Sequence, residues 1–162
     1  MKKLLSIVLS FAFIYAVAQE PVKDANFYKG EGNTAYQAKD YAKAYENYKT
    51  AVELLDADGV TDTVLVYNTG FAAYKAKMYE EAIPFFDKAG DLGYKEDKPY
   101  QTIAACQSKL DDYKGMEATT TKGLEKYPDS DKLKELLAHS LLKQGLEFYN
   151  EGNDIKKAAN ES

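Results

Sequence analysis

The sequence predicts an all-α protein, a right-handed α-solenoid of antiparallel helix pairs, and three observations point to this fold class. When the chain is offset against itself by 38 residues, eight of the twenty positions from 32 to 51 are identical to their counterparts. Apolar residues recur at helical spacing within both copies, and Gly and Ala hold matching places that let two helices approach closely. A repeat of this length indicates a solenoid, in which each unit buries its face only against its neighbours.

The first eighteen residues predict a secretory signal peptide. Two lysines precede the apolar run from Leu4 to Val17, and Ala16-Val17-Ala18 has the small-x-small pattern of a cleavage site. This run would span about 21 Å as a helix against the ~30 Å hydrocarbon core of a bilayer, which makes an uncleaved membrane anchor the weaker alternative. We therefore expect an exported protein, periplasmic or secreted, with a short linker at 19–23 and no stable membrane insertion after cleavage.

Three helix pairs are expected to follow. Each unit pairs two helices across a short turn, and Asp or Thr residues before several of them supply N-cap oxygens. The units and their helices are expected at 24–57 (helices 24–38 and 41–55), 61–94 (helices 61–77 and 79–91) and 97–128 (helices from 97 and over 113–126). The third unit is a degenerate copy: Tyr113 matches Tyr79 at an offset of 34, but Thr120 stands where the second unit has Phe86.

Residues 130–162 predict a long helix and an incomplete fourth unit. Seven apolar residues between 133 and 148 recur at helical spacing, so one face of a helix over 130–150 is apolar. The helix is expected to stop at Gly152-Asn153, and a short helical stub to begin at Asp154. Because solenoids normally close with a polar-faced capping helix, we expect the stub, a partner, a second copy or further sequence to cover the apolar face.

Composition and charge exclude several classes of function. The chain of 162 residues has a net charge of −5, and all of its 21 basic residues are lysine, which argues against a nucleic-acid partner. A single Cys excludes a disulfide scaffold, and a single His excludes a His-based metal site. We therefore expect neither a metal nor a cofactor.

The side chains that could take part in catalysis are better interpreted as packing or solvent-exposed residues. Cys106 falls at a small packing position equivalent to Ala72, so a buried, inert thiol is expected. His139 lies among leucines with no partner for a catalytic triad, and the adjacent pairs Glu80-Glu81 and Asp111-Asp112 point in different directions. No Gly-rich phosphate loop or nucleophile elbow occurs in the sequence. The sequence therefore predicts that the protein is not an enzyme.

The two clear copies share a pattern of small and aromatic residues. They read Gly32…Tyr41…Ala44…Tyr48…Ala51 and Gly70…Tyr79…Ala82…Phe86…Ala89. Over about residues 24–128 this pattern resembles the tetratricopeptide repeat (TPR), here of an exported bacterial type. The resemblance implies that the first helices of successive repeats line a concave groove, which in this family holds a peptide or a partner's helix.

The same resemblance suggests a specific site. Some chaperone adaptors of this family clamp a peptide's terminal carboxylates with Lys and Asn from the first repeat, Asn from the second, and Lys and Arg from the third. Here the matching positions hold Lys29, Asn33, Asn68 and Lys98, with Thr102 in place of the Arg. Charge-assisted hydrogen bonds from such a set would hold a carboxylate, whereas the loss of Arg removes the two-pronged donor.

An aromatic stripe on the second repeat is the other candidate binding surface. Tyr67, Phe71 and Tyr74 lie about one helical turn apart on the third expected helix. We expect Tyr67 and Phe71 to be exposed, because the first and third repeats carry polar or small residues at the equivalent positions. An exposed stripe would suit an apolar or Pro-containing peptide, whereas a stripe covered by the third repeat would only be core.

Together these features predict a non-catalytic protein–protein interaction module or scaffold of the cell envelope. Its partner would be a protein or peptide segment held in the concave groove. Because a fold does not fix a function, the alternative is an N-terminal helper module of a larger exported protein with an enzymatic or carbohydrate-binding domain downstream. Self-association through the uncapped C-terminal end is a third interpretation.

Overall fold

The computed structural model describes residues 23–161, and this part of the chain folds into seven helices without a strand. The helices are α2 (Ala25–Gln37), α3 (Tyr41–Ala57), α4 (Thr63–Lys75), α5 (Tyr79–Asp91), α6 (Lys98–Lys109), α7 (Tyr113–Lys126) and α8 (Asp131–Glu161). The expected signal peptide and most of the expected linker lie outside the described residues. Of the helices described, none has the length and apolar character needed to cross a bilayer.

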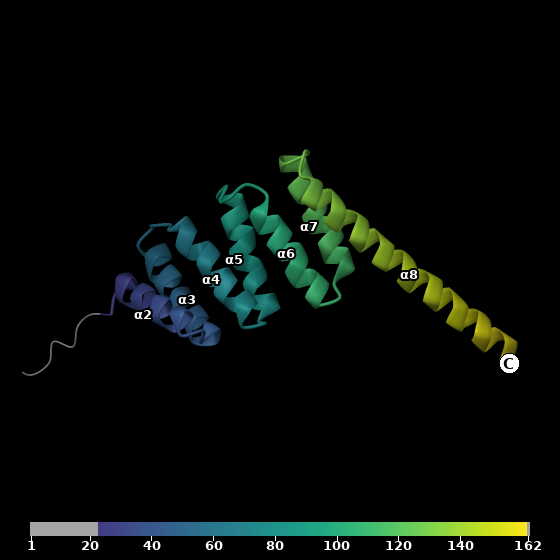
Figure 1. The fold of residues 1–162 in the computed structure, drawn as a ribbon, viewed down its shortest axis with the longest axis horizontal. Helices are drawn as coiled ribbons and strands as arrows, with labels where there is room; N and C mark the ends of the chain where they lie inside the picture. The colour runs from purple at the N-terminus through teal and green to yellow at the C-terminus, as the bar shows by residue number, and fades with distance from the viewer. Residues whose placement is uncertain (1–22, 162) are drawn as a thin grey trace, which may run out of the picture.

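Each helix packs against the next one along the chain. The main contacts join consecutive helices from α2 to α8, and α6 additionally contacts α8. Figure 1 shows the helix pairs following one another along the long axis of the molecule, without a common centre around which they wrap. This is the α-solenoid that the sequence predicts. For the first six helices, every bound that the sequence set lies within two residues of the observed one; no end was expected for the fifth.

Repeated local features place the helix ends. Four helices are capped by an Asp side chain that accepts a hydrogen bond from the backbone N–H three residues later, at 2.8–3.2 Å: Asp24, Asp40, Asp62 and Asp112. Such a cap contributes about 1 kcal/mol. The turn inside each helix pair uses one left-handed residue, and these are Lys39 (φ 62°), Lys77 (φ 64°) and Asp111 (φ 55°). The three pairs therefore turn in the same way, including the degenerate third one.

Small side chains set the distance between paired helices. Gly32 of α2 lies directly against the ring of Tyr48 in α3, so that a Cβ atom at this position would overlap the ring. Gly70 of α4 occupies the equivalent place against α5, where a Cβ atom would lie 3.2 Å from the carbonyl oxygen of Ala82. Ala82 itself is fully buried. The close approach inferred from the repeated Gly and Ala positions is confirmed in both units.

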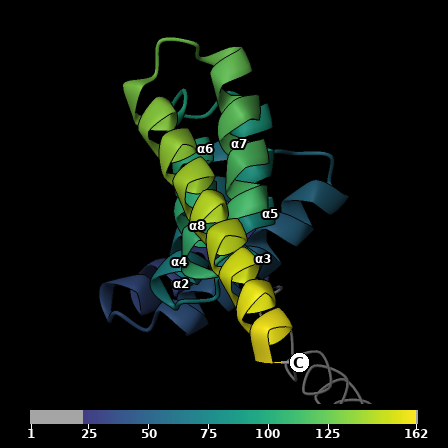
Figure 2. The ribbon, with the colours of Figure 1, turned by 90° about the vertical axis from the view of Figure 1, so that its right-hand side faces the viewer.

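The last helix differs from the prediction. α8 continues from Asp131 to Glu161 through the Gly152-Asn153 pair, at which a stop and a separate stub were expected. A glycine inside a helix costs only about 1 kcal/mol, and no proline follows to end the helix. A stub of about two turns would also be too short to be stable on its own. Figure 2 shows α8 as one unbroken helix that lies across the end of the solenoid.

Candidate functional site

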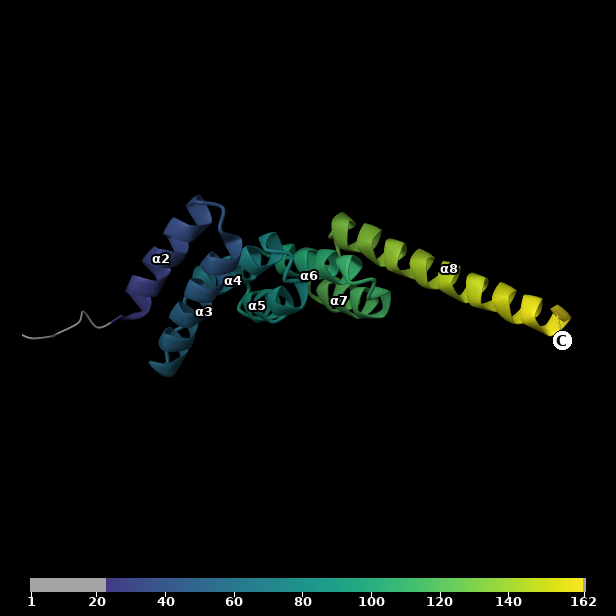
Figure 3. The same ribbon diagram turned by 90° about the horizontal axis from the view of Figure 1, so that it is seen from below.

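Two adjoining hollows lie on the side of the solenoid formed by α2, α4, α6 and α8. Figure 3 separates these helices from α3, α5 and α7, which form the other side. The first hollow, of about 400 Å³, lies between α2, α4 and the start of α6. The second, of about 450 Å³, lies between α4, α6 and α8. Because both hollows are lined by Tyr67, Phe71 and Lys98, we describe them together as the inner groove.

Helix α6 contributes one regular face to the inner groove. Lys98, Thr102, Ala105 and Lys109 all line the second hollow. Their spacing of four, three and four residues places them along one side of a helix. The face therefore carries a lysine at each end and small side chains in the middle. Gln101 and Ser108 lie beside it and also line the hollow.

The aromatic stripe of α4 forms one wall of the groove. The Tyr67 and Phe71 rings stack with centroids 6.2 Å apart, and the Phe71 and Tyr74 rings with centroids 6.3 Å apart. The expected exposure of Tyr67 is wrong, because only 7% of this residue is accessible. The ring of Tyr94, in the loop before α6, packs on it at 4.7 Å between centroids. Phe71 and Tyr74 are half-buried and line the second hollow, so Phe71, which was also expected to be exposed, is only partly accessible.

The groove is lined by lysines and by no carboxylate. Lys95, Lys98, Lys109 and Lys132 line the two hollows, and neither Asp nor Glu is among the described residues that do so. Lys95 lies over the rings of Tyr67 and Tyr94, with its Nζ atom 5.4 and 5.0 Å from their centroids. Its interaction with the Tyr94 side chain raises the pKa of Lys95 above the usual lysine value. The groove therefore presents positive charge beside aromatic surface.

The structure brings together only part of the predicted carboxylate-binding set. Asn68 and Lys98 both line the first hollow, and both are exposed. The Lys29 ammonium instead forms an ion pair with Asp62 at 2.7 Å and lines neither hollow. The Asn33 side-chain oxygen accepts a hydrogen bond from the Tyr48 hydroxyl at 2.8 Å, and Asn33 also lines neither hollow. A carboxylate clamp built from all four residues remains a prediction.

The ion pair of Lys29 also stabilises a helix end. Burial opposes ionisation of Asp62, but hydrogen bonds from the Lys29 side chain and the Leu65 backbone outweigh it and lower the pKa of this carboxyl. Asp62 is the N-cap of α4. Its carboxylate thus fixes Lys29 of the first repeat to the start of the second repeat.

Several groove residues were not predicted from the sequence. Lys95 comes from the loop before α6, and Leu136 and His139 come from α8. Lys109 could have been found, because it continues the spacing of Lys98 and Ala105 along α6. The residues of α8 could not, because they reach the groove only through the packing of α8 against α6.

The structure places both side chains that the sequence offered as candidates for catalysis, Cys106 and His139. Cys106 of α6 is fully buried and lines neither hollow, and burial raises the pKa of its thiol to about 12, so that no reactive thiolate forms at neutral pH. His139 is exposed at the rim, 6.3 Å from the Tyr113 ring between centroids. Within residues 23–161, no three His, Cys, Asp or Glu side chains come together in a way that would hold a metal ion.

Solved structures with the same arrangement of helices identify the fold. A TPR repeats protein from Bacteroides fragilis superposes with a TM-score of 0.68 and 34% sequence identity, over 82% of this chain and 58% of that chain. The chain has the tetratricopeptide-repeat fold. The TPR domain of Sgt2 from Aspergillus fumigatus matches with a TM-score of 0.55 and 26% identity, over 80% of this chain and 83% of that domain. No family model matches the sequence.

The curated relatives that the chain matches are much longer proteins. Hsp70-Hsp90 organizing protein 3 of Arabidopsis thaliana is 33% identical over 132 residues, which cover 74% of this chain and 23% of the relative. Stress-induced-phosphoprotein 1 of Caenorhabditis elegans is 35% identical over 82 residues, which cover 50% of this chain and 24% of the relative. The chain therefore spans about a quarter of the length of these relatives.

Proposed function

We propose that this chain is a non-catalytic protein-interaction module that holds a peptide segment of its partner in the inner groove. The observation that carries the proposal is the groove itself, in which aromatic and lysine side chains line two adjoining hollows of about 400 and 450 Å³. Binding sites are typically hollows of this size, with apolar walls and a few polar groups that fix orientation. A groove along the inner helices suits an extended chain better than a compact molecule.

The relatives support a binding role. The relative from Arabidopsis thaliana is named an Hsp70-Hsp90 organizing protein, a name that describes assembly of other proteins and not a reaction. Of the two candidates for nucleophile and base, Cys106 is fully buried and lines neither hollow, whereas His139 is exposed and lines the second hollow. We expect purified protein to form complexes without turning over a substrate.

Site-specific photocrosslinking tests the proposed groove. A photoreactive phenylalanine analogue placed at Thr102, on the groove face of α6, is expected to form adducts with partner proteins in cells of the source organism. The matched control is Thr121, an exposed residue of α7 that lines neither hollow. Adducts at Thr102 and none at Thr121 support the proposal. Equal labelling at both positions, or labelling only at Thr121, would place the interaction elsewhere and refute it.

We also propose that the module acts outside the cytoplasm, in the periplasm or beyond it. The support is the sequence pattern of the first eighteen residues, with Ala16-Val17-Ala18 before a cleavage point. Protein purified from the source cells is then expected to begin at Gln19 when its N-terminus is sequenced. An intact Met1 in the cytosolic fraction would contradict export while leaving the peptide-binding proposal unaffected.

A further inference from the structure

The charge of the inner groove is opposite to that of the whole chain. The chain carries 26 acidic residues against 21 lysines, yet the described residues that line the groove include four lysines and no carboxylate. Of these lysines, Lys132 forms an ion pair with Glu135 at 2.9 Å. Among residues 23–161, no carboxylate lies within ion-pairing distance of Lys95, Lys98 or Lys109. Charge complementarity therefore favours an acidic ligand.

The distance between two of these lysines predicts how far apart the acidic groups of the ligand lie. Lys98 and Lys109 are the first and last residues of α6 and lie on one side of the helix. Eleven residues of helix span about 16 Å, because an α-helix rises 1.5 Å per residue. An extended peptide covers the same distance with about five residues, at about 3.3 Å each. Two carboxylate side chains about five positions apart would thus match both ammonium groups.

Between the two lysines the groove is apolar and has room for a side chain. Thr102 and Ala105 are the small residues in the middle of this face of α6. Tyr74 of α4 and Leu136 of α8, both half-buried, stand on either side, and the fully buried Met116 lies below. A hollow of about 450 Å³ with such walls suits one large aromatic or aliphatic side chain.

The same region is poorly built for a peptide's C-terminal carboxylate. Binding of that group with defined geometry is best done by a two-pronged donor such as arginine, and Thr102 stands where the family's Arg would be. Lys29 is paired with Asp62 and lines neither hollow. The remaining lysines are single ammonium groups spread along the groove, an arrangement that matches separate acidic side chains.

Building on the function proposed above, we infer that the inner groove binds an internal acidic segment of its partner. The segment is extended, carries two Asp or Glu residues about five positions apart, and inserts a large apolar side chain between them into the hollow over Thr102 and Ala105. Recognition does not require a free C-terminus. Lys98 and Lys109 pair with the two carboxylates, and Lys95 adds positive charge near the start of α6.

Binding of synthetic peptides tests the inference directly. The probe is an acetylated and amidated Gly/Ser peptide with two glutamates about five positions apart and a phenylalanine midway, with affinity measured by fluorescence anisotropy. Changing both glutamates to glutamine is expected to lower the affinity at least tenfold, and so is changing the phenylalanine to serine. Raising the salt concentration is expected to weaken binding of the acidic peptide, because its charged contacts are screened.

Variants of the protein locate the binding site. Lys98→Gln and Lys109→Gln are each expected to weaken binding about threefold to fivefold, and the double variant about tenfold or more. The matched control, Lys114→Gln, removes the same charge from an exposed position on α7 that lines neither hollow, and is expected to leave the affinity unchanged. Ala105→Leu fills the hollow and should abolish the preference for phenylalanine over serine. The thermal melting of each variant checks that it is folded. The glutamine and serine peptides test the inference on the unaltered protein, so that test does not depend on the folding of a variant.

Failure of this inference is distinguishable from failure of the proposed function. Tight binding only of the free-acid peptide, or only of the glutamine peptide, would refute an internal acidic segment while leaving a peptide-binding groove in place. Binding of a single-stranded oligonucleotide at the same lysines, in preference to the peptides, would also refute it. If no peptide of the set binds while Thr102 still crosslinks to partner proteins, the inferred ligand chemistry is wrong, but the proposal that the groove binds a partner is unaffected.

Discussion

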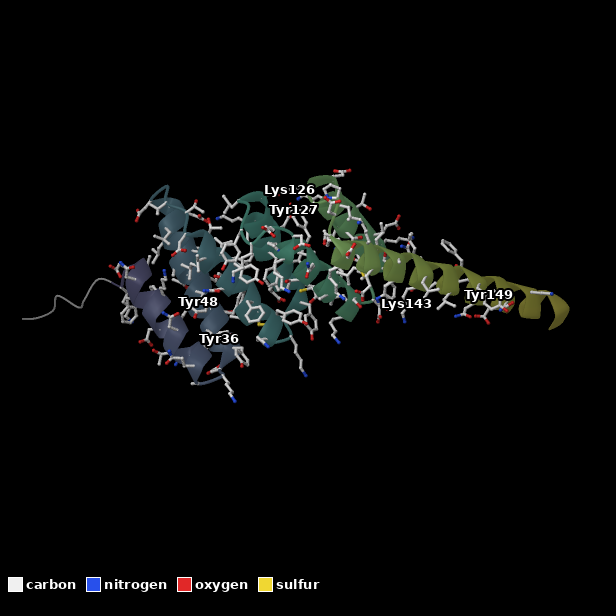
Figure 4. All side chains as sticks on the ribbon, turned by 45° about the horizontal axis from the view of Figure 1, so that its top comes forward. Tyr36, Tyr48, Lys126, Tyr127, Lys143 and Tyr149 are labelled. Carbon is white, nitrogen blue, oxygen red and sulfur yellow. The ribbon has the colours of Figure 1, made fainter. Side chains whose placement is uncertain are left out.

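Apolar side chains are buried within the repeats and exposed at the far end of α8. Within the repeats Phe86 is fully buried, whereas on α8 Phe148 is 66% and Tyr149 67% exposed. Gln144 of α8 still contacts the repeats, because its side-chain amide donates to the carbonyl oxygen of Tyr113, the first residue of α7, at 3.3 Å. Beyond that point α8 extends past α7, as Figures 1 and 4 show. A helix of this fold is thus stabilised by its neighbours, and where they end only its intrinsic propensity remains.

The largest difference between the two regions is expected from removing a phenylalanine ring. Phe86→Ala empties a fully buried site between α4 and α5 and is expected to lower the free energy of unfolding by about 3–5 kcal/mol. Phe148→Ala, the same change on the exposed end of α8, should alter it by less than about 0.5 kcal/mol. Urea unfolding followed by circular dichroism measures both. Similar losses would show that the end of α8 is buried in solution, for example against a second copy.

Glycines of one helix allow a finer test of close packing. In α2, Gly32 lies against the Tyr48 ring, whereas a Cβ atom at Gly30 would meet nothing within 4 Å. Gly32→Ala is therefore expected to destabilise the protein by about 1–2 kcal/mol, because overpacking outweighs the gain in helix propensity. Gly30→Ala should instead stabilise it by about 0.5–1 kcal/mol. If both substitutions shifted the melting temperature in the same direction, the spacing of α2 and α3 would not depend on Gly32.

The link between the first and second repeats is expected to depend on pH. Asp62→Asn keeps a capping oxygen but loses the ion pair with Lys29, so stability at pH 7 should fall by about 0.5–1 kcal/mol. Because folding lowers the pKa of Asp62, its carboxylate contributes fully above the usual aspartate pKa. The contribution is lost as the pH falls through the lowered value. Unfolding curves of the two proteins should therefore converge in acid, and a constant difference at every pH would contradict the ion-pair explanation.

The sequence predicted the solenoid well because its signals are local. The bounds of α5 and α7 were predicted to the residue, since a turn and a Tyr at the same position open both helices, Tyr79 and Tyr113. The error at Tyr67 has a non-local cause: its ring packs against Phe86 of α5 and against Tyr94, which belongs to a loop that follows no repeat pattern. The break expected at Gly152-Asn153 failed for a related reason, because a turn there would need a second helix with enough buried surface to stabilise it.

The candidate site could be predicted only in part. Five of the seven predicted binding residues line the inner groove, because they lie on the inner faces of α4 and α6: Tyr67, Asn68, Phe71, Tyr74 and Lys98. Lys29 and Asn33 occupy the equivalent helix of the first repeat but are held by Asp62 and Tyr48 instead. Partners of that kind come from a neighbouring helix or the next repeat, and a repeat alignment does not contain them.

The smallest effect on overall stability is expected at the end of α8. Gly152 has open space around it, so Gly152→Ala should favour the local helix by about 1 kcal/mol. Because that segment lies beyond α7, the change should leave the global unfolding midpoint in place and slow hydrogen exchange of the nearby amides about fivefold. Gly30→Ala is the control, since the same substitution inside the repeats should raise the midpoint. A rise of the midpoint for Gly152→Ala, together with a mass above that of the monomer in light scattering, would mean that the end of α8 unfolds with the body. In that case its exposed Leu146, Phe148 and Tyr149 are covered by a second copy, and the contrast between the two regions exists only in the isolated chain.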